Sequence, residues 1–229
     1  MKICGLQKMT LLDYPAKVAC TVFTEGCNLR CPFCHNAGLV NKTVSEAYPE
    51  EEILGFLAKR CDVLDGVCIT GGEPLLQPDI EAFIYKIKKI GYSVKLDTNG
   101  TMPERLKKLI DNKYVDYVAM DVKNRIEKYS LSAGADMQWS SSVEKSIDIL
   151  LEGKVDYEFR TTVVKELHTV SDIEALAKRI SGAKNYFLQQ FVDSGNLICG
   201  NLTPHDVSVL ETMREVAARY TQNVQLRGV

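Results

Sequence analysis

The sequence lacks the features that direct a chain to a membrane or to nucleic acid. Its 28 Lys and Arg nearly balance 30 Asp and Glu, so there is no basic surplus to bind a nucleic-acid backbone or anionic lipid. No apolar run approaches the roughly 20 residues that span a bilayer. Residues 1–15 also lack the basic and then apolar pattern of a secretory signal. These absences predict a cytoplasmic protein that acts on another protein or on a small molecule.

A disulfide framework is also unexpected, although the chain has eight cysteines. Reducing compartments keep thiols free for metal or redox chemistry. Five of the eight form no close pair of ligand type, and of these Cys20 and Cys68 fall within strand patterns as small core residues. The five are Cys4, Cys20, Cys61, Cys68 and Cys199. The other three, Cys27, Cys31 and Cys34, stand together and are the candidate ligands.

Apolar strand patterns alternate with helical patterns along the chain, and a length of 229 residues suits one domain better than two. The predicted strands are 18–24, 66–70, 93–98, 115–122, 157–164 and 186–191, with a short further strand at 224–227. The predicted helices are 51–59, 79–90, 104–111, 141–152, 173–180 and 206–219. Such alternation suits parallel strands joined by right-handed helical crossovers, in a doubly wound sheet or in a barrel. Residues 1–229 are therefore expected to form a single domain.

Polar motifs lie where the predicted strands end, and they help to choose between these architectures. The cysteines follow the first strand, Gly71-Gly72-Glu73-Pro74 follows the second, and Asp97-Thr98-Asn99-Gly100 ends the third. Asp121 and Lys123 end the fourth strand, and Gln189-Gln190 ends the sixth. The carboxyl ends of barrel strands share one rim, where barrel enzymes place their chemistry. We therefore expect an α/β fold, a partial (β/α)6 TIM-like barrel, with its site at the C-terminal rim.

Cys27, Cys31 and Cys34 are separated by three and then two residues. On a helix these thiols would spread over about 10 Å at about 1.5 Å per residue, so a loop curled around one centre fits them better. Three thiolates bind three irons of a cubane cluster and leave the fourth iron without a protein ligand. Structural zinc needs a fourth ligand at finger-like spacing, and His35 is poorly placed to supply it. A non-catalytic iron–sulfur carrier also needs a fourth ligand, and buried free thiols are the remaining alternative.

The cysteine triplet with Phe33 resembles the signature of the radical S-adenosylmethionine superfamily, and Cys34-His35-Asn36 looks like its glycyl-radical-enzyme activase branch. Asp13-Tyr14-Pro15 and Glu25-Gly26 are similar to the same branch. The resemblance implies an oxidoreductase whose catalytic centre is a [4Fe–4S] cluster on the three cysteines. It also implies that S-adenosylmethionine occupies the open iron and is reductively split to a 5′-deoxyadenosyl radical.

The resemblance further implies which residues hold the cofactor. Gly71-Gly72-Glu73 looks like the segment that contacts the methionine amino group, although paired glycines are also common in plain turns. Lys123 and Arg160 look like partners of the cofactor's carboxylate and ribose region, with surface ion pairs as the alternative. A hard monovalent cation is implied at oxygens of Asp97, Thr98, Ala119 and Asp121. The implied cofactor-binding residues are Phe33, Gly71, Gly72, Glu73, Asp97, Asn99, Asp121, Lys123, Arg160 and Gln190.

Residues 188–191 depart from pyruvate formate-lyase activases, which carry a His near there, and resemble anaerobic ribonucleoside-triphosphate reductase activating proteins instead. The implied partner is a glycyl radical enzyme, most like that reductase, whose glycine loses a Cα hydrogen. A low-potential donor such as flavodoxin or ferredoxin would supply the electron. The alternatives are a pyruvate formate-lyase-type activase and a radical enzyme that acts on a small molecule. His168 and His205 match no motif and are expected on the surface or as caps.

Overall fold

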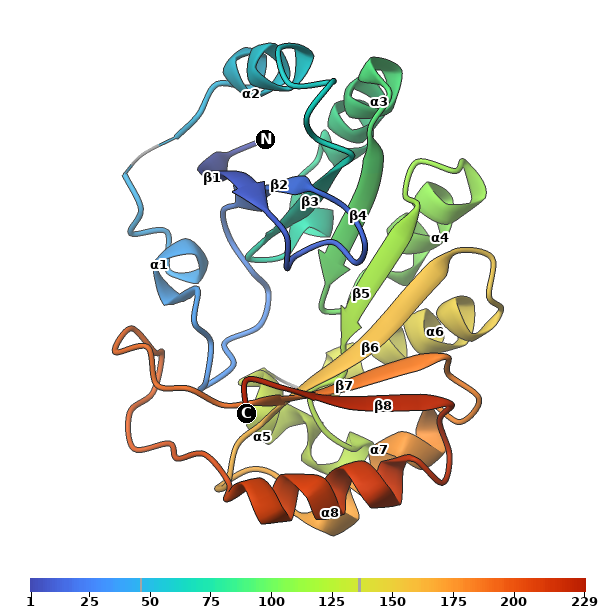
Figure 1. The fold of residues 1–229 in the computed structure, drawn as a ribbon. Coiled ribbons are helices and arrows are strands. Elements are labelled where there is room, and N and C mark those ends of the chain that lie inside the picture. The colour runs from blue at the N-terminus through green and yellow to red at the C-terminus, as the bar shows by residue number, and fades with distance from the viewer. Residues whose placement is uncertain (46, 136) are drawn as a thin grey trace.

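The computed structural model describes residues 1–45, 47–135 and 137–229, and one eight-stranded sheet runs through it (Figure 1). The strands are β1 (Ile3–Thr10), β2 (Ala19–Thr24), β3 (Gly66–Gly71), β4 (Ser93–Thr98), β5 (Tyr117–Asp121), β6 (Asp156–Val163), β7 (Asn185–Gln190) and β8 (Asn223–Arg227). They neighbour one another in chain order, with β1 antiparallel to β2 and every later pair parallel. Among the described strands β8 does not pair with β1, so the curled sheet is an open, partial barrel.

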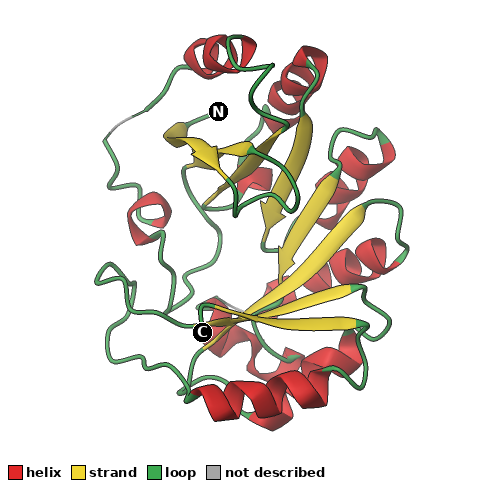
Figure 2. Ribbon diagram, in the orientation of Figure 1, coloured by secondary structure: helices red, strands yellow, loops and turns green. Residues whose placement is uncertain are grey.

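Helices α3, α4, α6, α7 and α8 cover the outer side of the curled sheet (Figure 2). The eight helices of the described ranges are α1 (Ala37–Val40), α2 (Glu50–Ala58), α3 (Ile80–Ile90), α4 (Pro103–Asp111), α5 (Tyr129–Ala133), α6 (Ser140–Leu151), α7 (Val170–Arg179) and α8 (Val207–Ala217). Short 3-10 turns occupy Pro74–Leu76, Ile126–Lys128 and Met137–Trp139. Within these described ranges, no helix has both the length and the apolar character needed to cross a membrane.

The hydrophobic core lies between the sheet and these helices, and α3 shows how the sequence builds it. Ile80, Phe83, Ile84 and Ile87 are fully buried on one face of the helix, because residues three and four apart share a face. Gly91 ends the helix in the left-handed region, with φ 112°. Both the apolar face and the C-cap agree with the sequence prediction for this segment.

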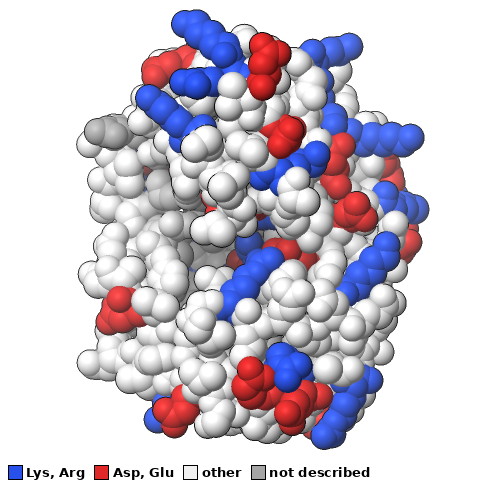
Figure 3. Space-filling model, viewed as in Figure 1, with Lys and Arg blue, Asp and Glu red and all other residues white. Residues whose placement is uncertain are grey.

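The inner face of the sheet is polar and charged instead. Side chains alternate between the two faces of a strand, and Lys95 and Asp97 of β4 line the same interior space as Glu158 and Arg160 of β6. Glu158 is bonded to Arg227 of β8 at 3.0 Å. Acidic and basic side chains are interspersed over the face seen in Figure 3, in keeping with a net charge of −2. Acidic and basic groups are therefore paired inside the barrel as well as on its surface.

The α/β class and the partial barrel predicted from the sequence are confirmed, with six parallel strands, β2 to β7, at the predicted places. The short strand expected near the C-terminus is β8, which extends the parallel sheet. The sequence analysis does not predict β1, because three consecutive exposed residues interrupt the alternation that marks a strand.

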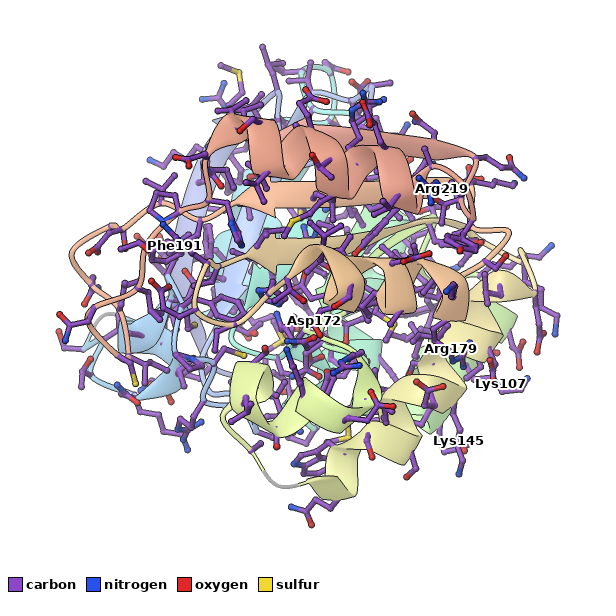
Figure 4. All side chains as sticks on the ribbon, turned by 90° about the horizontal axis from the view of Figure 1, so that it is seen from below. Lys107, Lys145, Asp172, Arg179, Phe191 and Arg219 are labelled. Atoms are coloured by element: carbon purple, nitrogen blue, oxygen red, sulfur yellow. The ribbon has the colours of Figure 1, made fainter. Side chains whose placement is uncertain are left out.

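Helix α7 begins at Val170 rather than at residue 173, because Thr169 and Asp172 form a capping box. The Asp172 carboxylate, labelled in Figure 4, is fully buried and also lies 2.8 Å from Arg125 and 2.7 Å from Lys128. These contacts join the start of α7 to the segment that follows β5. The earlier start of the helix therefore comes from tertiary contacts as well as from the cap.

Candidate active site

The loop after β2 carries the clustered cysteines and lies at the carboxyl ends of the parallel strands. Residues 25–34 form no helix, and the Cys34 N–H donates to the Cys31 carbonyl at 3.0 Å in a turn. Cys27, Cys31 and Cys34 all line one cavity of about 230 Å³. The structure therefore brings the three thiols around a common space, as a curled loop requires.

Burial dominates the environment of these thiols. It raises the pKa of Cys27 to about 11 and the pKa of Cys31 to about 12. The Leu29 N–H and the Asn99 side-chain amide both donate to the Cys27 sulfur, at 3.4 and 3.6 Å. Coordination to a metal deprotonates a thiol outright, and the bound ions then compensate the buried negative charge. Three thiols that line one cavity are the type of donor that an iron–sulfur cluster takes.

Gly71 ends β3 and Gly72 follows it, and both lie directly against the segment that leads into the cysteine loop. A Cβ on Gly72 would lie 2.0 Å from the Gly26 carbonyl oxygen, and a Cβ on Gly71 would lie 2.3 Å from the Thr24 nitrogen. Gly71 also has φ 115°, which side chains rarely adopt. The Glu73 N–H donates to the same Gly26 carbonyl at 2.8 Å. Glycine is therefore required where the two loops pack, and its bare backbone lines the cavity.

Glu73 is fully buried, and it is not among the described residues that line the cavity. Its carboxylate accepts hydrogen bonds from the Leu75 N–H at 3.1 Å and the Asn99 N–H at 2.7 Å. The Thr98 hydroxyl donates a third at 2.9 Å. Burial raises the pKa of Glu73 to about 7. The carboxylate joins the loop after β3 to the loop after β4.

Charged side chains from β4, from β6 and from the end of β5 together form one wall of the cavity, called the charged wall below. Arg160 of β6 bridges two carboxylates, with Nη1 3.1 Å from Asp97 of β4 and Nε 2.9 Å from Asp121 of β5. Lys123 lies 2.8 Å from the other oxygen of Asp121. Burial alone would raise the pKa of Asp121, but Arg160 and Lys123 outweigh it and hold that pKa well below its usual range. All four groups are therefore charged.

Gln189 and Gln190 end β7 on opposite faces of the sheet, as neighbours on a strand do. Gln189 lines the cavity. Gln190 is not among the lining residues, and its side-chain amide donates to the His205 carbonyl at 2.7 Å. In the structure Gln189, rather than the expected Gln190, therefore lines the cavity.

Aromatic rings pack against the side chains of the cysteine loop. Phe191, labelled in Figure 4, stacks on His35 with ring centroids 6.1 Å apart. The His168 ring meets Phe33 edge-on at 6.4 Å, and its Nε2 lies 2.8 Å from the Lys123 carbonyl oxygen. His168 is 1% exposed, so the expectation of a surface residue is wrong for it. His168 thus contacts both Phe33 of the cysteine loop and the backbone of Lys123.

The family described as the radical SAM superfamily matches residues 21–180, a span that holds the cysteines, the paired glycines and the charged wall. The chain belongs to the radical SAM superfamily. The resemblance seen in the sequence is thereby confirmed, and with it the enzyme class and the expected cofactors, a [4Fe–4S] cluster and S-adenosylmethionine.

Known proteins place this radical SAM enzyme near the activases. A Methanocaldococcus jannaschii protein whose name proposes it as a glycyl-radical enzyme activating enzyme is 34% identical over 99% of this chain and 96% of its own length. The pyruvate formate-lyase-activating enzyme of Clostridium pasteurianum is 26% identical over 81% of this chain and 85% of its own. A solved radical SAM methyltransferase from Sphaerobacter thermophilus shares the fold, with TM-score 0.73 over 95% of this chain and 68% of its own, at 13% identity.

Most of the residues expected to serve this radical SAM enzyme meet at the cavity, and three do not. Glu73, Ala119 and Gln190 are absent from the described lining residues. The expected residues that do line it are Cys27, Cys31, Phe33, Cys34, Gly71, Gly72, Asp97, Thr98, Asn99, Asp121, Lys123 and Arg160.

Sequence reasoning missed Asn36, Thr162 and Lys95. Asn36 and Thr162 line the cavity, and the Asn36 amide donates to the Gly71 carbonyl at 2.9 Å. Thr162 stands two residues after Arg160, and Lys95 two residues before Asp97. Residues two apart on a strand face the same side of the sheet. Counting two residues along the strand from Arg160 and from Asp97 could therefore have identified Thr162 and Lys95.

Proposed function

We propose that this radical SAM enzyme is a glycyl-radical-enzyme activase whose partner is an anaerobic ribonucleoside-triphosphate reductase. When bound, the cluster and S-adenosylmethionine supply a 5′-deoxyadenosyl radical, with one electron consumed and methionine released. A hydrogen atom then passes from a partner glycine Cα to that radical, which leaves a glycyl radical and 5′-deoxyadenosine. The observation that carries the proposal is one cavity where three thiols, a bare glycine backbone and a charged wall meet.

The chain's own groups have distinct proposed tasks in this reaction. Cys27, Cys31 and Cys34 bind three irons and leave one iron open to the cofactor. The backbone at Gly71 and Gly72 contacts the methionine amino group, where a Cβ would have no room. These groups fix the cofactor at the reducing centre before any hydrogen moves.

The remaining lining residues hold the rest of the cofactor. Lys123 and Arg160 are the cationic partners of its carboxylate and ribose, and Phe33 and Asn99 contact it from the two flanking loops. Gln189 meets the adenosine end at the last parallel strand of the cavity. Glu73 acts indirectly, because its carboxylate positions the Asn99 loop through the backbone N–H at 2.7 Å.

The partner's glycine loop enters through the open side of the barrel. A second cavity of about 520 Å³ shares Asp97, Arg160 and Gln189 with the first, so the two adjoin at these side chains. Its outer wall includes Leu12, which is 92% exposed, and Arg227 of β8. Because β8 does not close on β1 in the described sheet, an extended peptide has a route to the cofactor. Glycine suits the reaction because no side chain blocks its Cα.

The test is to mix the reduced, cluster-loaded enzyme with S-adenosylmethionine and each candidate partner without oxygen. Electron paramagnetic resonance should then show a glycyl-radical doublet on the reductase. A doublet only on pyruvate formate-lyase would favour the second candidate, to which the 26% identical Clostridium relative points. Rapid cofactor cleavage with no radical on any glycyl radical enzyme would refute the activase proposal and favour a small-molecule substrate.

We propose in addition that flavodoxin or ferredoxin delivers the electron, that the enzyme works in the cytoplasm, and that residues 1–229 act as one radical SAM domain. The eight cysteines are all free thiols, which suits a reducing compartment. The sheet draws strands from residue 3 to residue 227, which supports one structural unit. Reduction of the cluster by each purified donor, followed by optical absorbance, tests the electron route.

A further inference from the structure

Every carboxylate oxygen of the expected cation site already meets a cationic nitrogen. On Asp97, Oδ1 lies 2.5 Å from Lys95 Nζ and Oδ2 lies 3.1 Å from Arg160 Nη1. On Asp121, Oδ1 lies 2.9 Å from Arg160 Nε and Oδ2 lies 2.8 Å from Lys123 Nζ. An alkali-metal ion at these oxygens would therefore lie beside ammonium and guanidinium groups of like charge.

The other two expected cation ligands, Thr98 and Ala119, have hydrogen-bonding or strand partners within the chain. The Thr98 hydroxyl donates to Glu73 at 2.9 Å and accepts from the Gly100 N–H at 3.2 Å. Ala119 lies inside β5, paired with Asp97 on one side and Glu158 on the other, where strand carbonyls take part in the ladder hydrogen bonds. The side-chain oxygens implied for a monovalent cation are thus all engaged by partners within the described chain.

The Lys95 ammonium is a positive charge of the chain itself that lies beside Asp97, at the expected cation site. Lys95 stands two residues before Asp97 on β4, so both side chains face the barrel interior. Its side chain is 3% exposed, and Nζ also lies 3.8 Å from the Cys68 sulfur. Burial alone would lower the pKa of Lys95, but Asp97 outweighs it and keeps the pKa above its ordinary value. The ammonium is therefore permanently charged beside the carboxylate.

We infer that the Lys95 ammonium takes the place of the monovalent cation, so that this chain binds S-adenosylmethionine without an alkali-metal ion. The inference rests on the proposed function, which puts the cofactor carboxylate at this wall. Lys95, Arg160 and Lys123 carry three positive charges against the two carboxylates, so the wall already holds a surplus positive charge that can attract the cofactor carboxylate. An added alkali-metal ion would enlarge that surplus in a buried space, which is costly.

The test measures cofactor affinity in three salts. Calorimetry of S-adenosylmethionine binding to the cluster-loaded enzyme is run without oxygen in choline, sodium and potassium chloride at equal ionic strength. The wild-type Kd should agree within about twofold in all three. Lys95→Met should bind about tenfold more weakly in choline, and sodium or potassium should restore most of the loss by filling the vacated place. Lys86→Met, which removes a lysine from an exposed pair with Glu50, should match the wild type.

Three results would overturn the inference. One is a wild-type Kd that tightens about tenfold when sodium or potassium replaces choline. Another is a folded Lys95→Met variant that keeps its affinity in choline, or loses affinity that no alkali salt restores. The third needs no variant: sodium-23 NMR of the wild type should show no line broadening on cofactor addition, and broadening would reveal a bound ion. A protein that binds no S-adenosylmethionine in any salt would instead refute the proposed function.

Discussion

Replacing Gly72 by Ala should damage the site through a clash that can be sized from the structure. The added Cβ would lie 2.0 Å from the Gly26 carbonyl oxygen and 2.5 Å from its carbonyl carbon. Both atoms are backbone, so the loop that leads into Cys27 must move. Overpacking of this kind costs about 1–3 kcal/mol, and loss of the Glu73 N–H bond to Gly26 adds about 1 kcal/mol.

These terms together lower the free energy of unfolding by about 3 kcal/mol. A protein of this size loses about 2–4 °C of melting temperature per kcal/mol, so Gly72→Ala should melt roughly 10 °C below the wild type. Because Gly26 precedes Cys27, the first of the proposed ligand cysteines, the variant should also hold less iron after reconstitution and bind S-adenosylmethionine poorly. Thermal unfolding followed by circular dichroism without oxygen, together with iron content, measures both effects.

Gly55→Ala is the matched control, since a Cβ there meets nothing within 4 Å inside α2. Alanine is favoured over glycine in a helix by about 1 kcal/mol, so this variant should melt at or slightly above the wild-type temperature. A Gly72→Ala protein that melts within about 2 °C of the wild type, less than 1 kcal/mol, and keeps its iron would show that the two loops do not pack as described.

Three further predictions concern other groups of the site. Ala at Cys27, Cys31 or Cys34 should abolish the cluster absorbance, whereas Ala at Cys4, Cys61 or Cys199 should preserve it; loss at one of the latter would change the ligand assignment. Gln189→Ala should weaken S-adenosylmethionine binding about tenfold, the worth of one hydrogen bond, while Gln190→Ala should leave calorimetric affinity unchanged, and the reverse result would restore Gln190 to the cavity. Burial raises the pKa of Glu73 from 4.5 to about 7, so the folded protein binds the Glu73 proton more tightly than the unfolded protein does. This protonation contributes fully to the free energy of unfolding below pH 4.5, and the contribution is lost as pH rises through 7. The free energy of unfolding of the wild type should therefore fall by about 3 kcal/mol between pH 5 and pH 8, whereas that of Glu73→Gln should not, and parallel melting temperatures of the two proteins across this pH range would contradict the prediction.

Local sequence patterns predicted most of the helices and strands of the fold. The apolar face of α3 and the strands β2 to β7 follow from periodicities of the chain itself, because a helix or a parallel strand must bury its apolar residues against its neighbours. The strand β1 lacked such a pattern, and its pairing with β2 supplies the order that its own residues do not specify. The early start of α7 likewise depends on the buried Asp172, which Arg125 and Lys128 of the segment after β5 contact.

Spacing within the sequence determined the chemistry of this protein: Cys27, Cys31 and Cys34 lie in one short loop, so their proximity needs no long-range contact. The tertiary structure alone decided a few of the groups that share the cavity with them. It turned Gln189 rather than Gln190 inward, and it tied Glu73 to the Asn99 loop. It also placed Lys95 against Asp97 inside the barrel. The physical reason is that side-chain direction depends on strand register and on partners from other strands, which pair residues far apart in the chain.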